Sequence, residues 1–206
     1  ELSAKVIQGI EQAILDLFDT CSRKHSYRDD PEETNIHYYN GWKTNKCWKI
    51  NKKIILPMWG ALKSNYSGGH RLDYDMTQKL GDMVKVFNYL SKDKINVQQL
   101  VGMRCNAADQ SGDFDLDLRY FRIKIFKKGT CHLWFKDLTL LDKFNIFGSQ
   151  RKNWLPPAYG KKRYTEMSEE ERQTVDSFQG KEKYEQVMKD SDFYIVDART
   201  LLLDAQ

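Results

Sequence analysis

The chain has 206 residues, of which 40% are hydrophobic and 30% are charged, and its formal net charge is +4. This composition excludes a chain that is disordered over its whole length. The length suits one domain, or one domain with a small appendage. No apolar run approaches the roughly 18 residues that a membrane-spanning helix needs, so we expect no membrane partner.

The start of the chain and its cysteines indicate where the protein works. The chain begins with Glu1 instead of Met and has no signal-type apolar block, which suggests a cytoplasmic protein and a piece of a longer polypeptide. The cysteines form no CxxC pair, and we expect reduced, buried thiols. They are Cys21, Cys47, Cys105 and Cys131.

A helix and a hairpin are expected first along the chain. Apolar residues recur every three or four positions across Leu2–Ser22, which predicts an amphipathic helix, followed by a polar loop. Farther on, Cys47–Ile50 and Lys53–Leu56 are aromatic or β-branched in patches, and Asn51-Lys52 between them fits a turn. We therefore predict that these two segments pair as a hairpin.

The middle of the chain predicts a second helix and a second hairpin. Apolar residues have helical spacing across Met76–Leu90, and Asp109–Asp117 has the composition of a polar loop. Leu118–Phe126 and Cys131–Lys136 form the best strand pair, because apolar and cationic residues alternate along the first of them. The register stays open, since an even-residue turn and a bulged three-residue turn bring different side chains opposite one another.

The last part of the chain predicts helices separated by a basic loop. Asp137 begins a short helix, and Pro156-Pro157 cannot lie inside a helix, so an extended basic loop runs to Arg163. Ser168–Glu171 is a capping box that starts the next helix, and Lys181–Lys189 predicts another.

Helices and hairpins in mixed order predict an α+β fold, in which antiparallel hairpins pack with several amphipathic helices. We expect a single domain with a helical C-terminal extension. The α+β domain covers residues 1–163, and the acidic helical segment covers residues 164–206. This segment contains eleven acidic and five basic residues.

Positive charge is concentrated in two segments. Residues 42–63 hold six lysines and no acidic residue, and residues 122–163 hold eleven Lys and Arg against two Asp. Every tryptophan also lies in these segments: Trp42, Trp48, Trp59, Trp134 and Trp154. Cations beside aromatic rings favour nucleic-acid binding, because phosphates need positive charge and bases need flat faces. Charge segregation of this kind indicates the type of partner.

Motifs for a catalytic cofactor are missing from the sequence. Neither a Gly-rich dinucleotide motif nor a Walker phosphate loop occurs, and we expect no cofactor. Pro156-Pro157-Ala158-Tyr159 is comparable to the Asn-Pro-Pro-Tyr loop of amino-methyltransferases, but Leu155 stands where that loop needs a polar residue. A glycine-rich methyl-donor motif is missing too, so this chain alone should not transfer methyl groups.

Acidic residues between positions 109 and 117 supply the candidate metal ligands, because hard cations prefer oxygen. These candidates are Asp113, Asp115 and Asp117. Their spacing departs from the EF-hand pattern, and Arg122-Ile123-Lys124 places a cation in the acidic slot of the (D/E)-x-K nuclease signature. We therefore predict a solvated loop and no metal. A metal-dependent nuclease that uses these aspartates with His70 or His132 is one alternative function.

Three segments carry a resemblance to a known family. Phe126–Phe135, Phe144–Pro157 and Gly41–Lys53 resemble a bacterial and phage family known as domain of unknown function 4942. Its members stand alone or sit beside a DNA adenine methyltransferase module on mobile elements. The resemblance implies a setting in DNA modification or phage biology and a DNA methyltransferase as a partner. It implies no catalytic residues.

Our preferred hypothesis is a non-catalytic nucleic-acid-binding accessory module with DNA as its expected ligand, in which Trp48 or Trp154 offers a stacking face and the basic loop forms a flexible arm. The phosphate-binding candidates are Lys43, Lys46, Lys49, Lys52, Lys53, Arg122, Lys124, Lys127, Lys128, Arg151, Lys152, Lys161, Lys162 and Arg163. The hypothesis requires that the two cationic segments converge on one exposed surface. A protein-interaction domain that docks on a DNA methyltransferase is the other alternative, since Trp, Tyr and Arg dominate protein interfaces.

Overall fold

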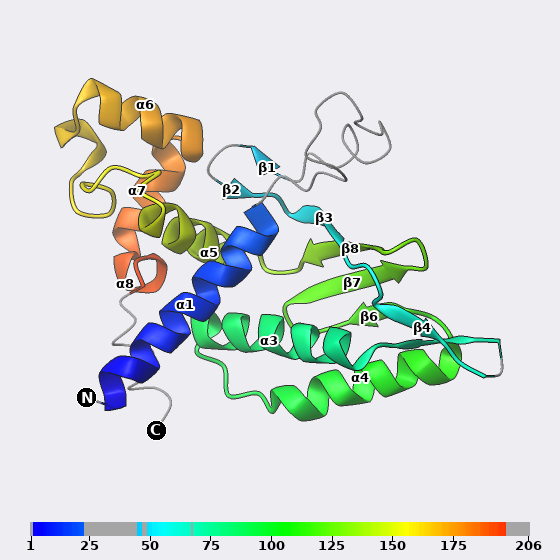
Figure 1. The fold of residues 1–206 in the computed structure, drawn as a ribbon. Coiled ribbons are helices and arrows are strands. Elements are labelled where there is room, and N and C mark those ends of the chain that lie inside the picture. The colour runs from blue at the N-terminus through cyan, green and yellow to red at the C-terminus, as the bar shows by residue number, and fades with distance from the viewer. Residues whose placement is uncertain (1, 23–44, 47–48, 67, 197–206) are drawn as a thin grey trace.

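The computed structural model describes residues 2–22, 45–46, 49–66 and 68–196 (Figure 1). Several sequence predictions lie outside these ranges, namely the first polar loop and the residues Trp42, Lys43, Cys47 and Trp48. Lys46 belongs to a described strand, but its side chain is also outside the described part.

Helices and strands follow one another in mixed order, which confirms the predicted α+β fold. The helices are α1 (Leu2–Ser22), α3 (Tyr74–Ser91), α4 (Val97–Ser111), α5 (Leu138–Arg151), the 3-10 helix η2 (Tyr164–Glu166), α6 (Glu169–Phe178), α7 (Lys181–Lys189) and α8 (Ser191–Tyr194). The strands are β1 (Asn45–Lys46), β2 (Lys49–Ile50), β3 (Lys53–Pro57), β4 (Leu62–Ser64), β5 (His70–Leu72), β6 (Asp115–Asp117), β7 (Phe121–Phe126) and β8 (Thr130–Phe135). No helix in the part of the chain that the structure describes is long and apolar enough to cross a membrane.

The central element is an antiparallel sheet of four strands in the order β3-β8-β7-β6. Successive side chains in a strand point to opposite faces, so each strand has a buried and an outer set. In β7 the buried set is Phe121, Ile123 and Ile125, and in β8 it includes Leu133 and Phe135. These residues form the floor of the hydrophobic core.

The predicted hairpin between Cys47–Ile50 and Lys53–Leu56 is wrong. β3 pairs with β8 instead, and β2 pairs with β1. The physical reason lies in two buried contacts. Ile54 and Leu56 of β3 add to the core beside the buried residues of β8. The amide of Asn145 in α5 accepts from the N–H of Ile50 at 2.7 Å and donates to its carbonyl at 3.1 Å, which fixes β2 on α5.

The second predicted hairpin is confirmed, and the structure settles its register. β7 and β8 pair so that Lys124 lies opposite His132 and Phe126 lies opposite Thr130. Three residues therefore form the turn, and Gly129 adopts a φ of 83° there, as a bulged three-residue turn requires. Trp59 lies against this glycine, since a Cβ at residue 129 would come within 2.4 Å of its ring.

The structure also corrects the polar loop predicted over Asp109–Asp117. α4 continues to Ser111, and β6 begins at Asp115 and adds the fourth strand to the sheet. α4 went undetected because its buried stripe is narrow and broken by polar residues. The stripe consists of Val97, Val101, Cys105 and Ala108. Gly112, with a φ of 71°, ends the helix in the left-handed conformation that glycine favours.

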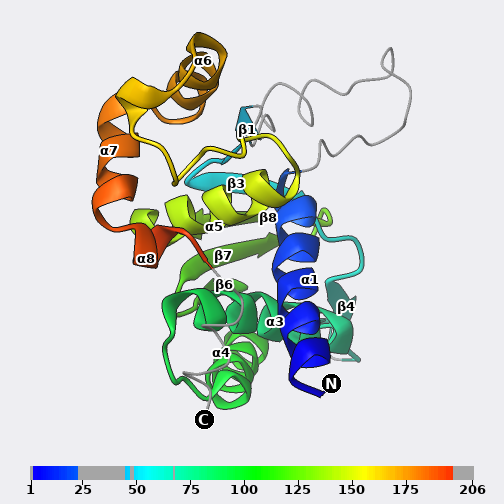
Figure 2. The ribbon, with the colours of Figure 1, turned by 90° about the vertical axis from the view of Figure 1, so that its left-hand side faces the viewer.

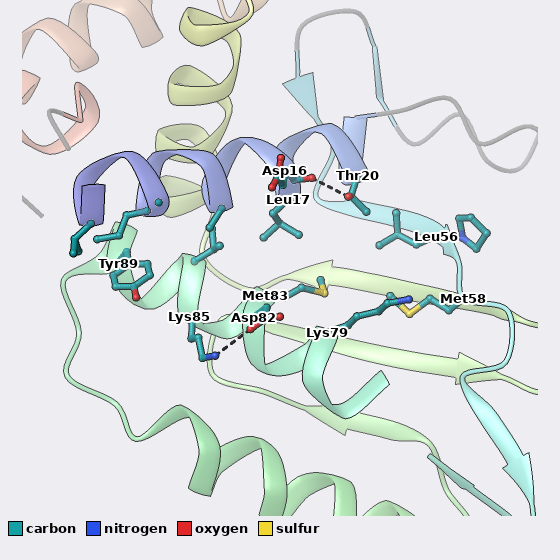
Figure 3. A pocket seen from close by; sticks show the side chains of 16 residues that line it. Asp16, Leu17, Thr20, Leu56, Met58, Lys79, Asp82, Met83, Lys85 and Tyr89 are labelled. Carbon is teal, nitrogen blue, oxygen red and sulfur yellow. Dashed lines mark hydrogen bonds and ion pairs between the residues drawn. The ribbon is translucent and has the colours of Figure 1, made fainter. Parts of the chain in front are cut away.

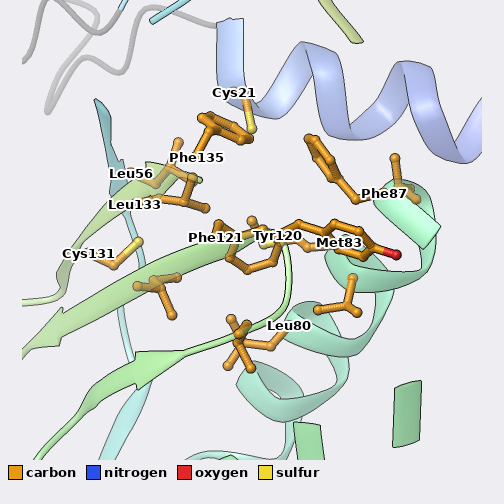
Figure 4. Packing of buried hydrophobic residues seen from close by; sticks show 14 of the residues in the cluster. Cys21, Leu56, Leu80, Met83, Phe87, Tyr120, Phe121, Cys131, Leu133 and Phe135 are labelled. Carbon is orange, nitrogen blue, oxygen red and sulfur yellow. The ribbon is translucent and has the colours of Figure 1, made fainter. Parts of the chain in front are cut away.

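α1 and α3 cover the buried face of the sheet (Figures 1 and 4). Cys21 of α1 and Phe87 and Met83 of α3 point toward side chains of the sheet (Figure 4). The ring of Phe87 lies 5.5 Å from that of Phe135 and 6.1 Å from that of Phe121, measured between centroids. This aromatic cluster joins the sheet to the helices. The opposite face of the sheet carries the side chains that point away from this core.

The chain after α5 packs as a separate apolar cluster at one side of the molecule (Figure 2). The predicted helices are confirmed here as α6, which starts with the Ser168–Glu171 capping box, and α7. Ile146 of α5 is buried in this cluster with Tyr159, Tyr184 and other residues that follow it. The loop before α6 is therefore a series of packed turns.

Candidate nucleic-acid interface

The outer face of the central sheet brings together cationic and aromatic side chains. We call it the outer face, and its side chains belong to Lys53, Ile55, Asp115, Asp117, Arg122, Lys124, Phe126, His132 and Trp134. Strand pairing arranges them in rows across the sheet. One row contains Lys53, Trp134 and Arg122, and the next contains His132 and Lys124.

A line of aromatic rings crosses this face. The ring centroids of Trp134 and His132 are 5.6 Å apart, and those of His132 and Phe126 are 4.7 Å apart. All three side chains are half-buried, so each has part of its surface open to solvent. Trp59 follows at the end of the sheet, over the β7–β8 turn, and is 58% exposed. Aromatic rings in a shallow surface provide stacking faces for bases.

Cations flank the ring of Trp134 from two strands. The Nζ of Lys53 lies 5.1 Å from the ring centroid, and the guanidinium carbon of Arg122 lies 5.6 Å from it. Both distances are within the range of cation–π attraction. Burial, together with the ammonium groups of Lys53 and Lys124, lowers the pKa of His132. Cations from β3 and β7 therefore lie next to the aromatic rings.

Asp115 opposes part of this positive charge. Its carboxylate accepts hydrogen bonds from the Nε and Nη2 of Arg122 at 2.7 and 2.5 Å, and the Nζ of Lys124 lies 3.5 Å away. The hydrogen bond from Arg122 and the two neighbouring cations lower the pKa of Asp115, so the carboxylate stays ionised. Lys53, Arg122, Lys124 and Asp115 together carry two net positive charges. A phosphate that binds here competes with an internal carboxylate.

Only some residues of the two cationic segments lie close together in the structure. Lys53 from the first segment meets Arg122 and Lys124 from the second, and Lys127 and Lys128 are exposed in the adjoining turn. Lys52 is exposed just before β3. Lys49 lies elsewhere, with its Nζ 6.0 Å from the ring of Phe178 in α6.

The prediction of a flexible basic arm after α5 is wrong, because this part of the chain is packed. Arg151 pairs with Glu11, and Lys152 pairs with Asp19 at 2.7 Å, so both residues hold α5 to α1. Lys162 lies 3.7 Å from Glu171 at the start of α6. Lys161 and Arg163 are exposed in the same packed turns. None of these five residues is among the side chains of the outer face.

The predicted stacking residues also need correction. Trp154 packs against the core, with its ring centroid 5.9 Å from that of Phe18, and Trp48 lies outside the described residues. Sequence reasoning missed Trp134, His132 and Phe126 as stacking residues. Their signal was the alternation along β7 and β8, which assigns them to one face only when the register is known.

The carboxylates of the nuclease alternative do not form a metal-binding group. Asp115 is held by Arg122 and Lys124, and Asp117 pairs with Lys136 at 2.6 Å. His132 lies two strands from Asp115, with Lys124 between them, and His70 belongs to the separate β4–β5 hairpin. Among the described residues, no group of three His, Cys, Asp or Glu side chains could hold a metal ion.

The surroundings of the cysteines within the described ranges make their thiols unreactive. Cys21 and Cys131 are fully buried in the core, and Cys105 is buried on α4. Burial raises the pKa of Cys131 to about 12 and also raises the pKa of Cys21 and of Cys105. These thiols therefore stay protonated at neutral pH and do not serve as nucleophiles.

A groove of about 710 Å³ lies between α1, α3 and β3 (Figure 3). Leu17, Met83 and Met58 contribute to its apolar lining, and the Asp82–Lys85 ion pair lies at its edge. The groove is on the helix-covered side of the sheet. The groove is therefore separate from the candidate interface. Its apolar lining also does not suit a phosphate backbone.

Comparison with known proteins yields one match. No curated protein and no solved structure matches the chain. Residues 1–154 match the family described as domain of unknown function DUF4942. The matched residues include α1, the whole central sheet and the outer face. The chain therefore belongs to the DUF4942 family.

Proposed function

We propose that this protein is a non-catalytic nucleic-acid-binding module associated with DNA modification, and that it binds through the outer face. One observation carries the proposal: cations from both cationic segments meet around a half-buried aromatic ring, Trp134. Phosphate contacts supply most of the affinity of proteins for nucleic acid, and aromatic rings supply stacking. The outer face offers both within a few ångströms.

The number of cations sets the expected salt dependence. Five of them are available on the outer face and its turn: Lys53, Arg122, Lys124, Lys127 and Lys128. If each neutralises one phosphate, the slope of log K against log salt is about −3.5 to −4.5. Raising the salt from about 50 to about 200 mM then weakens binding by about 100- to 500-fold.

The test is a titration of the full chain against labelled DNA at several salt concentrations. The double variant Lys53→Gln/Lys124→Gln removes two cations of the outer face, and we expect it to reduce the salt slope by about 1.4 to 1.8. The control Lys79→Gln/Lys94→Gln removes two exposed lysines outside the outer face, one in α3 and one in the turn after it. A flat salt response, or an equal loss of affinity in both double variants, would remove the proposal.

A DNA methyltransferase is the protein partner that we propose, and the family resemblance in the sequence supports it. In this arrangement residues 1–163 form the binding domain and residues 164–206 form the acidic segment. Among the described residues of this segment, those of α7 and α8 pack beside α5. Coexpression with a DNA adenine methyltransferase tests the partner directly. A complex that survives nuclease treatment supports it, and a complex lost after that treatment contradicts direct docking.

A further inference from the structure

We infer that the outer face binds single-stranded nucleic acid, with unpaired bases stacked on the line formed by Trp134, His132 and Phe126. This inference rests on the proposed function, because it specifies the ligand of the same face. It follows from the shape of the surface, the spacing of its rings and the small number of its cations.

The shape of the site suits unpaired bases. A four-stranded sheet presents a broad surface, whereas the elements that read a duplex are narrow enough to enter a groove. Bases in a duplex are stacked on one another and show only their edges. The rings of Trp134, His132 and Phe126 are side chains of such a broad sheet surface. Their faces become useful to a ligand only when its bases are unstacked.

The spacing of the rings also disfavours a duplex. Neighbouring ring centroids are 5.6 and 4.7 Å apart, which exceeds the rise of about 3.4 Å per base in a duplex strand. The ring planes are also tilted by 69° between His132 and Trp134 and by 57° between Phe126 and His132. Bases that stack on them must turn relative to one another, which a single strand allows and the parallel stack of a duplex does not. The rings occupy adjacent rows of one sheet, so a strand can cross β7 and β8 without bending around the molecule.

Lys53 and Arg122 already occupy positions over the ring of Trp134. Lys53 is exposed, so it can shift when a base arrives, while Arg122 stays hydrogen-bonded to Asp115 beside the ring. Their charged ends then lie beside the base, where its phosphates are. Stacking and phosphate contact therefore form together at this position.

The net charge of the outer face is small. Lys53, Arg122 and Lys124 are opposed by Asp115 and Asp117, which leaves one net positive charge, and Lys127 and Lys128 of the adjoining turn add two more. Stacking has to supply the remaining affinity, and the loss of one stacked base typically weakens binding by about 5- to 150-fold. A duplex gains no stacking from this surface.

The test compares three labelled probes with the full chain at one salt concentration. The probes are a thymidine oligomer of roughly twelve nucleotides, its uridine counterpart and a duplex of equal length. We expect the single strands to bind at least about tenfold more tightly than the duplex. The DNA and RNA arms show which of the two nucleic acids the site prefers. Duplex binding as tight as that of both single strands overturns the inference.

Two variants test the role of the rings. Trp134→Ala should weaken single-strand binding by about 5- to 150-fold and leave duplex binding nearly unchanged. The control is Tyr74→Ala, which removes an aromatic ring that is 73% exposed at the start of α3. This control should change neither binding reaction. If Trp134→Ala does not fold, Trp134→Phe replaces it. Quenching of tryptophan fluorescence by the thymidine oligomer should then fall sharply relative to the wild type, and unchanged quenching overturns the inference.

The outcomes separate the inference from the proposed function. Salt-dependent binding of the duplex with no binding of single strands leaves the proposed function standing and overturns the inference. A chain that binds none of the probes refutes both. Single-strand binding that survives the loss of the Trp134 ring refutes the stacking line.

Discussion

Removal of the Asp115 carboxylate should strengthen nucleic-acid binding. In the structure this carboxylate accepts two hydrogen bonds from Arg122 and lies 3.5 Å from the Nζ of Lys124. It therefore occupies the place where a phosphate oxygen would bind. Asp115→Asn removes the negative charge and keeps the size of the side chain.

The size of the effect follows from one additional unit of charge. The net charge of Lys53, Arg122, Lys124 and residue 115 rises from two to three. One further phosphate contact makes the salt slope steeper by about 0.7 to 0.9. At about 0.1 M salt this corresponds to a gain in affinity of about 5- to 8-fold. The Asp115 side chain is only 13% exposed and accepts two hydrogen bonds from Arg122, so we expect a loss of about 1 to 2 kcal/mol in the free energy of unfolding.

The assay is fluorescence anisotropy with a labelled single strand at several salt concentrations. Asp82→Asn is the matched control, because Asp82 also pairs with an exposed cation, Lys85, but lies at the edge of the groove beside α1. We expect the control to leave affinity and slope unchanged. Weaker binding by Asp115→Asn, or the same gain in both variants, would refute the competition between Asp115 and phosphate.

Three further predictions concern the folding of the chain around the site. Asn145→Ala leaves the N–H and C=O of Ile50 unpaired and should cost about 2 to 4 kcal/mol in urea unfolding. Tyr184→Phe removes the hydroxyl that accepts from Gly160 and donates to the carbonyl of residue 162, which should cost about 1 to 3 kcal/mol, whereas Tyr66→Phe at an exposed position should cost nothing measurable. Lys143 donates to a backbone carbonyl at the end of α3 and is 2% exposed, and burial lowers its pKa to about 8 from 10.5. The unfolded chain thus holds this proton more tightly, so wild-type stability should rise from pH 8 toward pH 10.5, and Lys143→Met should remove that rise in urea titrations at each pH. An equal pH dependence in both proteins would contradict the assignment.

The elements that sequence analysis predicted correctly are those determined by local patterns. α1 has a continuous apolar stripe, and the Ser168–Glu171 capping box marks the start of α6 within four residues. The β7–β8 hairpin combines alternation with a turn that contains Gly129. In each case the residues that determine the element are neighbours in the sequence.

The errors arise where distant residues decide the structure. β3 joins β8 because Ile54 and Leu56 bury themselves beside residues far along the chain, and nothing near β3 shows this. The position of β2 is likewise determined by a distant residue, Asn145, whose side chain hydrogen-bonds to the backbone of Ile50. Pairing between strands far apart depends on the whole core, which a local pattern does not contain.

The candidate site could be predicted in its chemistry and not in its geometry. The concentration of Lys, Arg and Trp in two segments pointed to phosphates and bases. Which members meet depends on the β3-β8-β7 order, which joins Lys53 to Arg122 and Lys124 and sends Arg151 and Lys152 to α1. The role proposed for Trp134 follows from the register, which no composition count reveals.

The most direct measurement is an NMR titration of the labelled chain with a single-stranded oligonucleotide, in which the indole N–H signals of the tryptophans are followed. We expect the Trp134 signal and the amides of β3, β7 and β8 to shift, while those of α1 and α3 around the groove stay in place. Shifts confined to the groove, or to the turns between α5 and α6, would contradict it.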